Sequence, residues 1–239
     1  MHLAGKTALV TGGTDGIGIW IARLLAKGGA KVIVCGRRED RLEAARGEGF
    51  EAIAADLSNV AGVDALLAEV QGRDLDILVN NAGAGADFDL SDSIDLEAAD
   101  RTIFLNLNAP IRLAAALVPR LRTRPEAALV NVTSGLAIAP RAGSPVYCAT
   151  KAALRSFTKA IRHQLKDSNV TVIEALPPVV DTAMTADRTG SKMSPEACAR
   201  QIVSAIEAGR SEANVGIVKI LKLVHSMSPR LAEAIMIRF

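Results

Sequence analysis

The chain has 239 residues, of which 49% are hydrophobic and 23% are charged. This apolar content is enough for a sizeable core and excludes a disordered or collagen-like chain. The 28 Lys and Arg residues nearly balance the 26 Asp and Glu residues, and only 3% of the chain is aromatic. Neither net charge nor stacking side chains support nucleic-acid binding, so we expect no nucleic-acid partner.

Cysteine and histidine usage argues against disulfide bonds and metal sites. The three cysteines lie far apart without a C-x-x-C pair, and the three histidines match no metal-ligand spacing. The first residues lack the apolar core of a signal peptide, and no run of about 18 uncharged apolar residues occurs. We expect a cytoplasmic protein with no metal and no membrane partner.

Apolar, β-rich runs alternate with longer segments of helical spacing along the chain. We expect strands at Thr7–Thr11, Lys31–Cys35, Ala52–Ala54, Asp76–Val79, Ala128–Val132, Val170–Ala175 and Val215–Val218. We expect helices at Ile17–Gly28, Glu39–Arg46, Val60–Val70, Asp95–Leu121, Ser144–Lys166 and Pro195–Ala208. This alternation is typical of a parallel sheet covered by helices on both faces. With no linker or internal repeat, residues 1–239 should form one doubly wound α/β domain.

Residues 222–239 are less regular in pattern. Ser228 and Pro229 are typical of a helix start, with Ser as the cap and Pro at the first helical position. We expect a helix that docks on the domain or on a second subunit. Association with a membrane surface is the alternative.

A glycine-rich segment follows the first strand and opens the first helix. Gly12, Gly16 and Gly18 are spaced G-x3-G-x-G. Glycines permit a tight turn and close approach of the backbone, and a helix N-terminus attracts a diphosphate. The segment therefore indicates nucleotide binding, with an ordinary turn as the alternative.

A second polar turn, Asn80-Asn81-Ala82-Gly83, ends the fourth strand. Ligands of open α/β sheets bind at the carboxyl ends of the strands, which makes this turn a candidate binding segment. A simple strand-ending turn is equally compatible with its composition.

Tyr147 and Lys151 lie four residues apart in a helix that Ser144 can cap, so they share one face. A nearby ammonium favours phenolate and lowers the tyrosine pKa from about 10 towards the range of a general acid. Such a pair can also be a solvated surface contact. Tyr147 is the only tyrosine, however, and Ser134 follows a strand thirteen residues upstream.

In this order and spacing, the glycine loop, the Asn80 turn, Ser134 and Tyr147-x3-Lys151 resemble the short-chain dehydrogenase/reductase family. The resemblance extends over residues 5–218 and implies a Rossmann-type three-layer sandwich with a mostly parallel sheet of about seven strands. Segment 177–182 corresponds to a family Pro-Gly-x-x-x-Thr motif, with Pro178 in place of Gly. Together with Cys35–Leu42, it resembles the DltE-like subgroup.

The resemblance also implies roles for individual residues. Tyr147 would be the acid/base, Ser134 would orient the substrate, and Lys151 would bind the nicotinamide ribose and tune Tyr147. The implied cofactor contacts are Gly12, Thr14, Asp15, Gly16, Ile17, Gly18, Arg37, Arg38, Asp56, Leu57, Asn81, Ala82, Gly83, Tyr147, Lys151, Val180 and Thr182.

The resemblance also implies a fourth catalytic position, Asn106, whose main-chain carbonyl would hold a water in the proton relay of the family. Pro110 lies four residues on and has no N–H, so it cannot donate the helical hydrogen bond to that carbonyl. If the helix runs through, the carbonyl is left free for a water. A kink without a role is the alternative.

The end of the second strand predicts the cofactor. Proteins that use NAD usually have an acidic residue there, whereas this chain has Gly36 followed by Arg37 and Arg38. A guanidinium can pair with a 2′-phosphate, and we assign Arg37 the larger part. Asp15 argues the other way, and the arginines could simply begin a solvated helix. On balance, NADPH is expected over NADH.

Taken together, the motifs predict an NADP(H)-dependent oxidoreductase acting on a ketone or secondary alcohol, with a compact polar lid at 184–194. A lyase or epimerase and a non-catalytic NADP-binding sensor or scaffold are the alternatives. The family resemblance also implies a homodimer or homotetramer that associates through the helices at 95–121 and 144–166.

Overall fold

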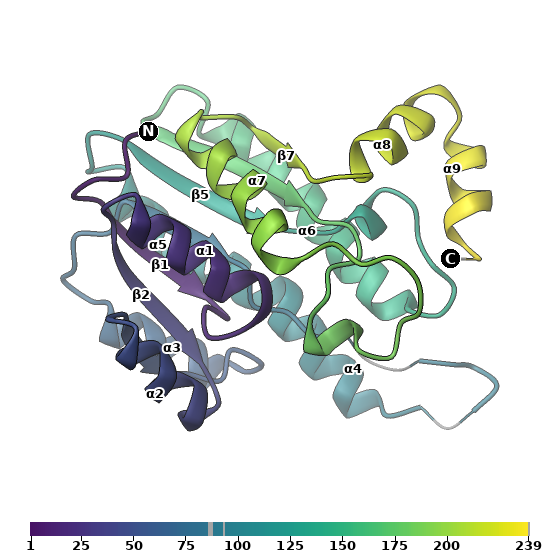
Figure 1. Cartoon of the computed structure of the whole chain (residues 1–239), viewed down its shortest axis with the longest axis horizontal. Helices are drawn as coiled ribbons and strands as arrows, with labels where there is room; N and C mark the ends of the chain where they lie inside the picture. The colour runs from purple at the N-terminus through teal and green to yellow at the C-terminus, as the bar shows by residue number, and fades with distance from the viewer. Residues whose placement is uncertain (86–87, 93, 239) are drawn as a thin grey trace.

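The computed structural model describes residues 1–85, 88–92 and 94–238. It contains a seven-stranded sheet in the order β3-β2-β1-β4-β5-β6-β7, with every neighbouring pair parallel (Figure 1). The strands are β1 Thr7–Thr11, β2 Lys31–Gly36, β3 Glu51–Ala54, β4 Ile77–Asn80, β5 Ala127–Val132, β6 Val170–Leu176 and β7 Glu212–Asn214. The expected parallel α/β sheet is confirmed.

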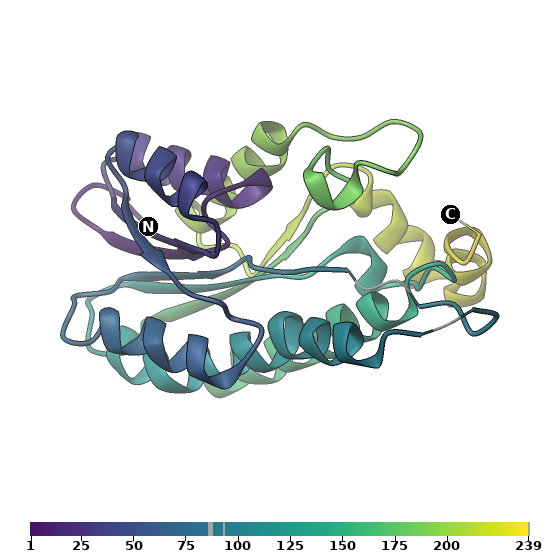
Figure 2. The ribbon, with the colours of Figure 1, turned by 90° about the horizontal axis from the view of Figure 1, so that it is seen from below.

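Helices cover both faces of this sheet, as Figure 2 shows. The α-helices are α1 Gly16–Lys27, α2 Glu39–Gly47, α3 Val60–Glu69, α4 Leu96–Ile103, α5 Ala109–Leu121, α6 Pro145–Gln164, α7 Pro195–Glu207, α8 Val218–Met227 and α9 Pro229–Met236. Helices α1, α2 and α7 bury their apolar residues in one core cluster, and α3, α5 and α6 bury theirs in a second cluster on the opposite face. The result is the three-layer sandwich that the sequence predicts.

The strand order reverses between β1 and β4. From β1 the chain builds outward through β2 and β3, and it then crosses back so that β4 pairs with the other side of β1. The loops that leave β1 and β4 therefore diverge to opposite faces and leave a crevice between them. The glycine loop follows β1 and the Asn80 turn follows β4, so both candidate segments meet at this crevice.

The seventh strand differs from its predicted position. The sequence predicts it at Val215–Val218, but β7 is Glu212–Asn214 and the chain then leaves the sheet. Gly216 has a φ of +55°, which ends the extended run. Val215 and Val218 are still buried, because they pack as the apolar junction between β7 and α8.

The long helix expected at 95–121 is continuous but contains a π-turn. Residues Phe104–Asn108 form this turn between α4 and α5, and the Ala109 N–H donates to the Phe104 carbonyl five residues back. Among the described residues, the combined helix Leu96–Leu121 is the one long and apolar enough to span a membrane by length and composition. Its apolar stripe, which includes Leu113 and Leu117, is buried in the core.

The C-terminal segment forms two helices beyond the carboxyl ends of the strands (Figure 1). The sequence predicts the start of α9, where the Ser228 hydroxyl accepts from the Leu231 N–H, but it does not predict α8. At the end of α9, the Ile237 carbonyl accepts from Ala142 in the loop before α6. The C-terminus is thereby attached to the loop that leads into the Tyr147 helix.

Candidate active site

The glycine loop is a turn in which side chains would collide. Gly12 has a φ of +60°, in the left-handed region that favours glycine. A Cβ on Gly18 would lie 2.1 Å from the Gly12 carbonyl oxygen, so only glycine lets the start of α1 approach the loop this closely. Asp15 caps α1 through a hydrogen bond from the Gly16 N–H of 2.7 Å. The loop therefore leaves a backbone cradle at the N-terminus of α1.

The Asn80 turn is tied to this loop by Thr11, the last residue of β1, and by Asn81, which directly follows β4. The Asn81 amide donates to the Thr11 carbonyl at 3.0 Å and to the Gly12 carbonyl at 3.3 Å. In the other direction, the Thr11 hydroxyl accepts the backbone N–H groups of Asn81 and Ala82, both at 3.0 Å. These contacts fix the spacing of the two loops on either side of the crevice.

Asn80 itself turns inward and has a structural role. Its side chain donates to Asn131 at 2.9 Å, and Asn131 donates to the Thr158 hydroxyl of α6 at 2.9 Å. All three side chains are buried. This polar chain holds α6 at a fixed position on β4 and β5, and α6 carries Tyr147 and Lys151.

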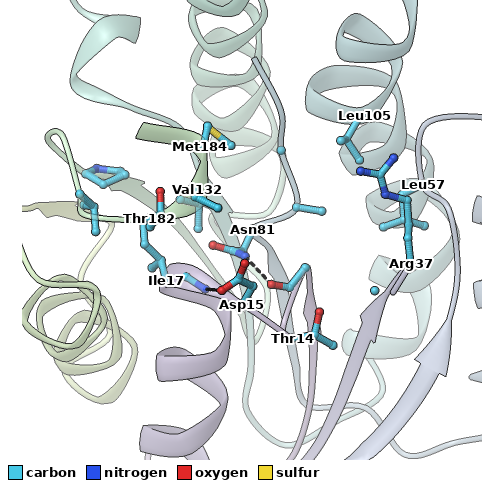
Figure 3. A pocket seen from close by; sticks show the side chains of 18 of the residues that line it. Thr14, Asp15, Ile17, Arg37, Leu57, Asn81, Leu105, Val132, Thr182 and Met184 are labelled. Carbon is cyan, nitrogen blue, oxygen red and sulfur yellow. Dashed lines mark hydrogen bonds between the residues drawn. The ribbon is translucent and has the colours of Figure 1, made fainter. Parts of the chain in front are cut away.

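A cleft of about 410 Å³ runs along the carboxyl ends of the strands. It is lined by every residue that the sequence assigns to catalysis or cofactor binding except Gly18 and Asn106, which lie behind its wall. Figure 3 shows Thr182 and Arg37 on opposite sides of this cleft, with Asn81 and Thr14 between them. Residues from seven different segments of the chain therefore converge on one site.

Three arginines line the end of the cleft near β2. Arg37 lies 3.9 Å from Asp56 and is 65% exposed, whereas Arg38 is held by two hydrogen bonds to Asp40. The third, Arg41, forms an ion pair of 2.5 Å with Asp15. The sequence alone suggests that Asp15 disfavours NADPH. In the folded chain, the charge of Arg41 offsets the charge of Asp15.

Gly36 has a packing reason to be glycine. A Cβ at this position would lie 2.6 Å from the Thr14 hydroxyl oxygen. An acidic side chain at the end of β2 would therefore displace Thr14, a wall residue of the cleft. The end of β2 therefore carries no carboxylate of the kind that an NAD ribose usually meets, and the three arginines share this part of the cleft with Asp15 and Asp56.

Tyr147 and Ser134 meet at the opposite end of the cleft. Ser134 caps the 3-10 turn Gly135–Ala137 and accepts from the Leu136 N–H at 3.1 Å. Burial raises the pKa of Tyr147 above its ordinary value of 10, while a hydrogen bond with Ser134 and the charge of Arg188 act to lower it. The net lowering of this pKa that the sequence predicts is thus wrong for this structure, because desolvation outweighs the influences that lower it.

Lys151 lies beneath the tyrosine rather than at its hydroxyl. Its ammonium nitrogen is 5.7 Å from the centre of the Tyr147 ring and donates to the Val132 carbonyl at 2.9 Å. The residue is only 3% exposed. Burial lowers the pKa of Lys151 to about 8. Two of its three N–H donors have no hydrogen-bond partner among the described residues.

Asn106 is fully buried in the π-turn and organises the loop after β4. Its amide donates to the Ala84 carbonyl at 2.8 Å and to the Thr150 hydroxyl at 3.1 Å, and its side-chain oxygen accepts from the Ala84 N–H. Both polar atoms of the Asn106 side chain therefore have hydrogen-bond partners within the protein. Pro110 supplies no N–H, so the main-chain carbonyl of Asn106 lacks the donor that an α-helix normally provides four residues on.

The segment that follows β6, residues 177–185, forms one wall of the cleft. Val180 is buried and bridges to Met193, and the Thr185 hydroxyl donates to the Val180 carbonyl at 2.5 Å. Thr182 faces the glycine loop, because a Cβ on Gly16 would lie 3.1 Å from its methyl carbon. The predicted lid starts with a short 3-10 turn, Ala183–Thr185, and the Lys192 ammonium donates to the carbonyls of Thr185 and of the next residue, Ala186.

The sequence pattern of the family described as short chain dehydrogenase matches residues 6–192. The chain belongs to this family. It is 43% identical over 189 residues to the uncharacterized oxidoreductase DltE of Bacillus subtilis (strain 168), an alignment that covers 77% of this chain and 75% of that protein. As a member of this family, the chain is an oxidoreductase, and the expected resemblance to DltE is confirmed.

Two further similarities bear on the cleft. The chain is 35% identical over 177 residues to the NADP-dependent 3-hydroxy acid dehydrogenase YdfG of Salmonella typhi, which covers 72% of this chain and 71% of that protein. Its structure is similar to a short chain dehydrogenase from Burkholderia cenocepacia J2315 in complex with NADP. That comparison has a TM-score of 0.88, 26% identity and 99% coverage of both chains.

Proposed function

We propose that this protein is an NADP(H)-dependent oxidoreductase that transfers a hydride between the cofactor and a ketone or secondary alcohol, with Tyr147 as the general acid/base. The observation that carries the proposal is the convergence of Ser134, Tyr147 and Lys151 at one end of a cleft whose other end is lined by arginines. The two ends match the two tasks of such an enzyme, because one binds a charged nucleotide and the other moves a proton.

The residues of the chain supply binding, orientation and proton transfer. Ser134 donates a hydrogen bond to the carbonyl oxygen of the substrate and directs it at the Tyr147 hydroxyl. Tyr147 protonates that oxygen during reduction and takes the proton back during oxidation. When bound in the cleft, NADPH supplies the hydride.

Lys151 contributes through its charge and its free donors. The ammonium beneath the ring stabilises the phenolate that remains after Tyr147 has given up its proton. Its two unused N–H groups suit the hydroxyls of a ribose. The main-chain carbonyl of Asn106, to which Pro110 cannot donate, would hold a water that resupplies the proton.

The cleft fits a phosphorylated dinucleotide. The glycine loop offers backbone N–H groups at the N-terminus of α1, and Gly12 and Gly16 of this loop line the cleft where a diphosphate would lie. Arg37, Arg38 and Arg41 line the β2 side and suit a 2′-phosphate. The names of the Salmonella and Burkholderia proteins, which include NADP, support the same choice.

The direct test is oxidation of NADPH by the purified protein in the presence of a panel of ketones and oxo acids, followed by absorbance. We expect turnover with at least one carbonyl and a higher kcat/KM with NADPH than with NADH. Tight NADPH binding without turnover of any carbonyl would instead favour a sensor or scaffold. Failure to bind NADPH would overturn the proposal altogether.

A further inference from the structure

Glu174 is a charged residue in the middle of the core. It lies in β6, whose other residues are uncharged, and among the described residues it is the one charged side chain with no exposed surface. Its carboxylate has a partner on each side. The Thr133 hydroxyl donates to Oε1 at 2.9 Å, and the Arg155 guanidinium of α6 donates to Oε2 at 2.8 Å. The carboxylate therefore joins the residue that follows β5 to the helix that covers it.

Stability alone does not explain this buried ion pair. The attraction between two buried charges is largely offset by the cost of removing them from water, and apolar residues of similar volume are often as stable or more stable. Val170 and Val172, which precede Glu174 on the same face of β6, belong to the core cluster that α6 covers. An apolar residue at position 174 would continue this core, so the charge there needs another reason.

One end of the contact is the segment that carries Ser134. Thr133 directly precedes Ser134, and both residues line the cleft. The backbone on either side of Ser134 is also fixed to β6. The N–H of Thr133 donates to the Ala175 carbonyl at 2.8 Å. The N–H of Gly135 donates at 2.9 Å to the carbonyl of Pro177, just beyond the strand. Ser134 therefore takes its position from β6, and the buried carboxylate adds a third tie.

The other end of the contact is the helix that carries Tyr147. Tyr147, Lys151 and Arg155 are spaced by four residues, so they lie along one stripe of α6. Lys151 attaches this stripe to β5, because its ammonium donates to the Val132 carbonyl at 2.9 Å. Arg155 attaches the same stripe to β6 one helical turn further on. The two contacts together fix the stripe against the carboxyl ends of both strands.

We propose that Glu174 and Arg155 are positioning residues that set the distance between Ser134 and Tyr147. The carboxylate holds Thr133, and with it Ser134, on one side. On the other side it holds α6, and with it Tyr147. A misplacement of about 1 Å between reacting groups can cost about a hundredfold in rate. This inference rests on the proposed function, in which both hydroxyls meet one carbonyl oxygen.

Three variants interrupt these contacts at different points. Thr133→Val removes one hydroxyl at nearly constant shape, Arg155→Met removes the guanidinium, and Glu174→Leu/Arg155→Met replaces the whole ion pair by apolar side chains. Each should lower kcat for the carbonyl that wild type reduces fastest by about tenfold to a hundredfold. The dissociation constant for NADPH should stay near the wild-type value, because these residues act on the substrate end. Thr133→Ser keeps the hydroxyl and should recover part of the loss.

The double variant separates position from stability. An apolar pair should leave the free energy of unfolding in urea near that of wild type, whereas Arg155→Met leaves a buried carboxylate unpaired and should lower it. A slow Glu174→Leu/Arg155→Met protein of wild-type stability would support the proposal, and wild-type kcat in this protein would overturn it. If the double variant is less stable, Thr133→Val gives the decision in the same way, because the ion pair is intact there.

Arg162 provides the matched control. It is also an arginine of α6 attached to the sheet, since its guanidinium donates to the Val172 carbonyl at 3.0 Å and to the Ser211 carbonyl at 2.8 Å. It lies about two helical turns beyond Arg155, away from Tyr147. Arg162→Met should therefore lower stability and leave kcat at the wild-type value. A fall in kcat as large as that of Arg155→Met would contradict a specific positioning role.

A second measurement does not require turnover. Tyr147 is the only tyrosine, so tyrosine labelled with carbon-13 at the carbon that bears the hydroxyl gives a single NMR resonance for this site. We expect this resonance to shift in Arg155→Met and in the double variant, and to stay in place in Arg162→Met.

The two measurements distinguish failure of the positioning role from failure of the proposed function. An unmoved resonance together with wild-type kcat in the variants would overturn the positioning role and leave the proposed function intact. In a protein that reduces no carbonyl, the resonance alone decides. A shift would then support the positioning role while contradicting the proposed function, and an unmoved resonance would overturn both.

Discussion

Lys151 carries its charge at a position that is almost closed to water. Its one hydrogen bond within the described structure goes to the Val132 carbonyl, and no carboxylate pairs with it. Because burial lowers the pKa of Lys151 to about 8, the protein holds this ammonium at a cost in stability. The proposed function would explain the cost, since an unpaired cation can serve a ribose and a phenolate.

This cost predicts a pH-dependent effect of Lys151→Met. Below pH 8, the lysine is charged in both the folded and unfolded states, so the full penalty of about 3 kcal/mol is present. Between pH 8 and about 10, the folded state has released a proton that the unfolded chain still binds, so the free energy of unfolding of wild type rises. We expect Lys151→Met to be the more stable protein at pH 7, by up to this amount, with the difference shrinking by pH 10. Urea denaturation of both proteins at pH 7 and pH 10 measures their free energies of unfolding. A difference between the two proteins that does not change with pH would contradict the buried-charge account.

Cofactor choice also depends on single residues. The sequence alone identifies Gly36 and Arg37, because their place at the end of β2 follows from strand counting. It does not reveal that Arg41 neutralises Asp15, since that contact joins the first turn of α2 to the cap of α1. Pair contacts between side chains of different elements depend on the packed structure and cannot be obtained from spacing.

Arg37→Ala should change cofactor preference. Loss of a charge-assisted contact to a 2′-phosphate should lower kcat/KM with NADPH by about tenfold to a hundredfold while NADH is little affected. Steady-state kinetics with both cofactors measure this, with Arg46→Ala as a control because Arg46 pairs with Glu39 and Glu43 outside the cleft. An equal fall in kcat/KM with both cofactors would show that Arg37 does not bind the 2′-phosphate.

At the scale of elements, the π-turn at Phe104–Asn108 is the main feature that the pattern of the sequence does not show. The helix at 95–121 was predicted as continuous from its apolar spacing, and it is continuous, but the wider turn brings the Asn106 side chain against Ala84 and Thr150. Periodicity reports which face is buried and is insensitive to one wide turn. The last strand was misplaced for a related reason, because Val215 and Val218 are buried without being in the sheet.

Pro110→Ala tests whether the turn serves the proton relay. The new N–H can donate to the Asn106 carbonyl and remove the acceptor that a water needs, so we expect a lower kcat with little change in far-UV circular dichroism. Pro119→Ala makes the same change within α5, remote from the cleft, and should leave kcat at the wild-type value. An unchanged kcat for Pro110→Ala from pH 6 to pH 9 would assign the proline a structural role only.

At the scale of the whole molecule, two helices present small exposed side chains. Ala115 and Ala116 of α5 and Ala149 and Ala152 of α6 are exposed, and such surfaces allow close helix packing between subunits. The family resemblance predicts a homodimer or homotetramer through this pair of helices. The sheet and its layers were predictable because they follow from alternation of apolar runs. The number of subunits depends on surface complementarity, which one sequence does not specify.

Sedimentation velocity tests this assembly. We expect a mass two or four times the 25.0 kDa of the chain, and Ala152→Glu should shift the protein to monomer by burying an unpaired charge in the interface. Ala208→Glu, on the exposed end of α7, should keep the wild-type mass. A wild-type mass of one chain would contradict the predicted assembly.

The central claim is that Tyr147 moves the proton in a hydride-transfer reaction of NADPH. Tyr147→Phe keeps the ring and removes only the hydroxyl, so kcat for carbonyl reduction should fall by about 10² to 10⁴-fold while the dissociation constant for NADPH stays near that of wild type. Both values come from one preparation, by absorbance kinetics and by fluorescence titration of NADPH. A Tyr147→Phe protein that retains the wild-type kcat would contradict the account.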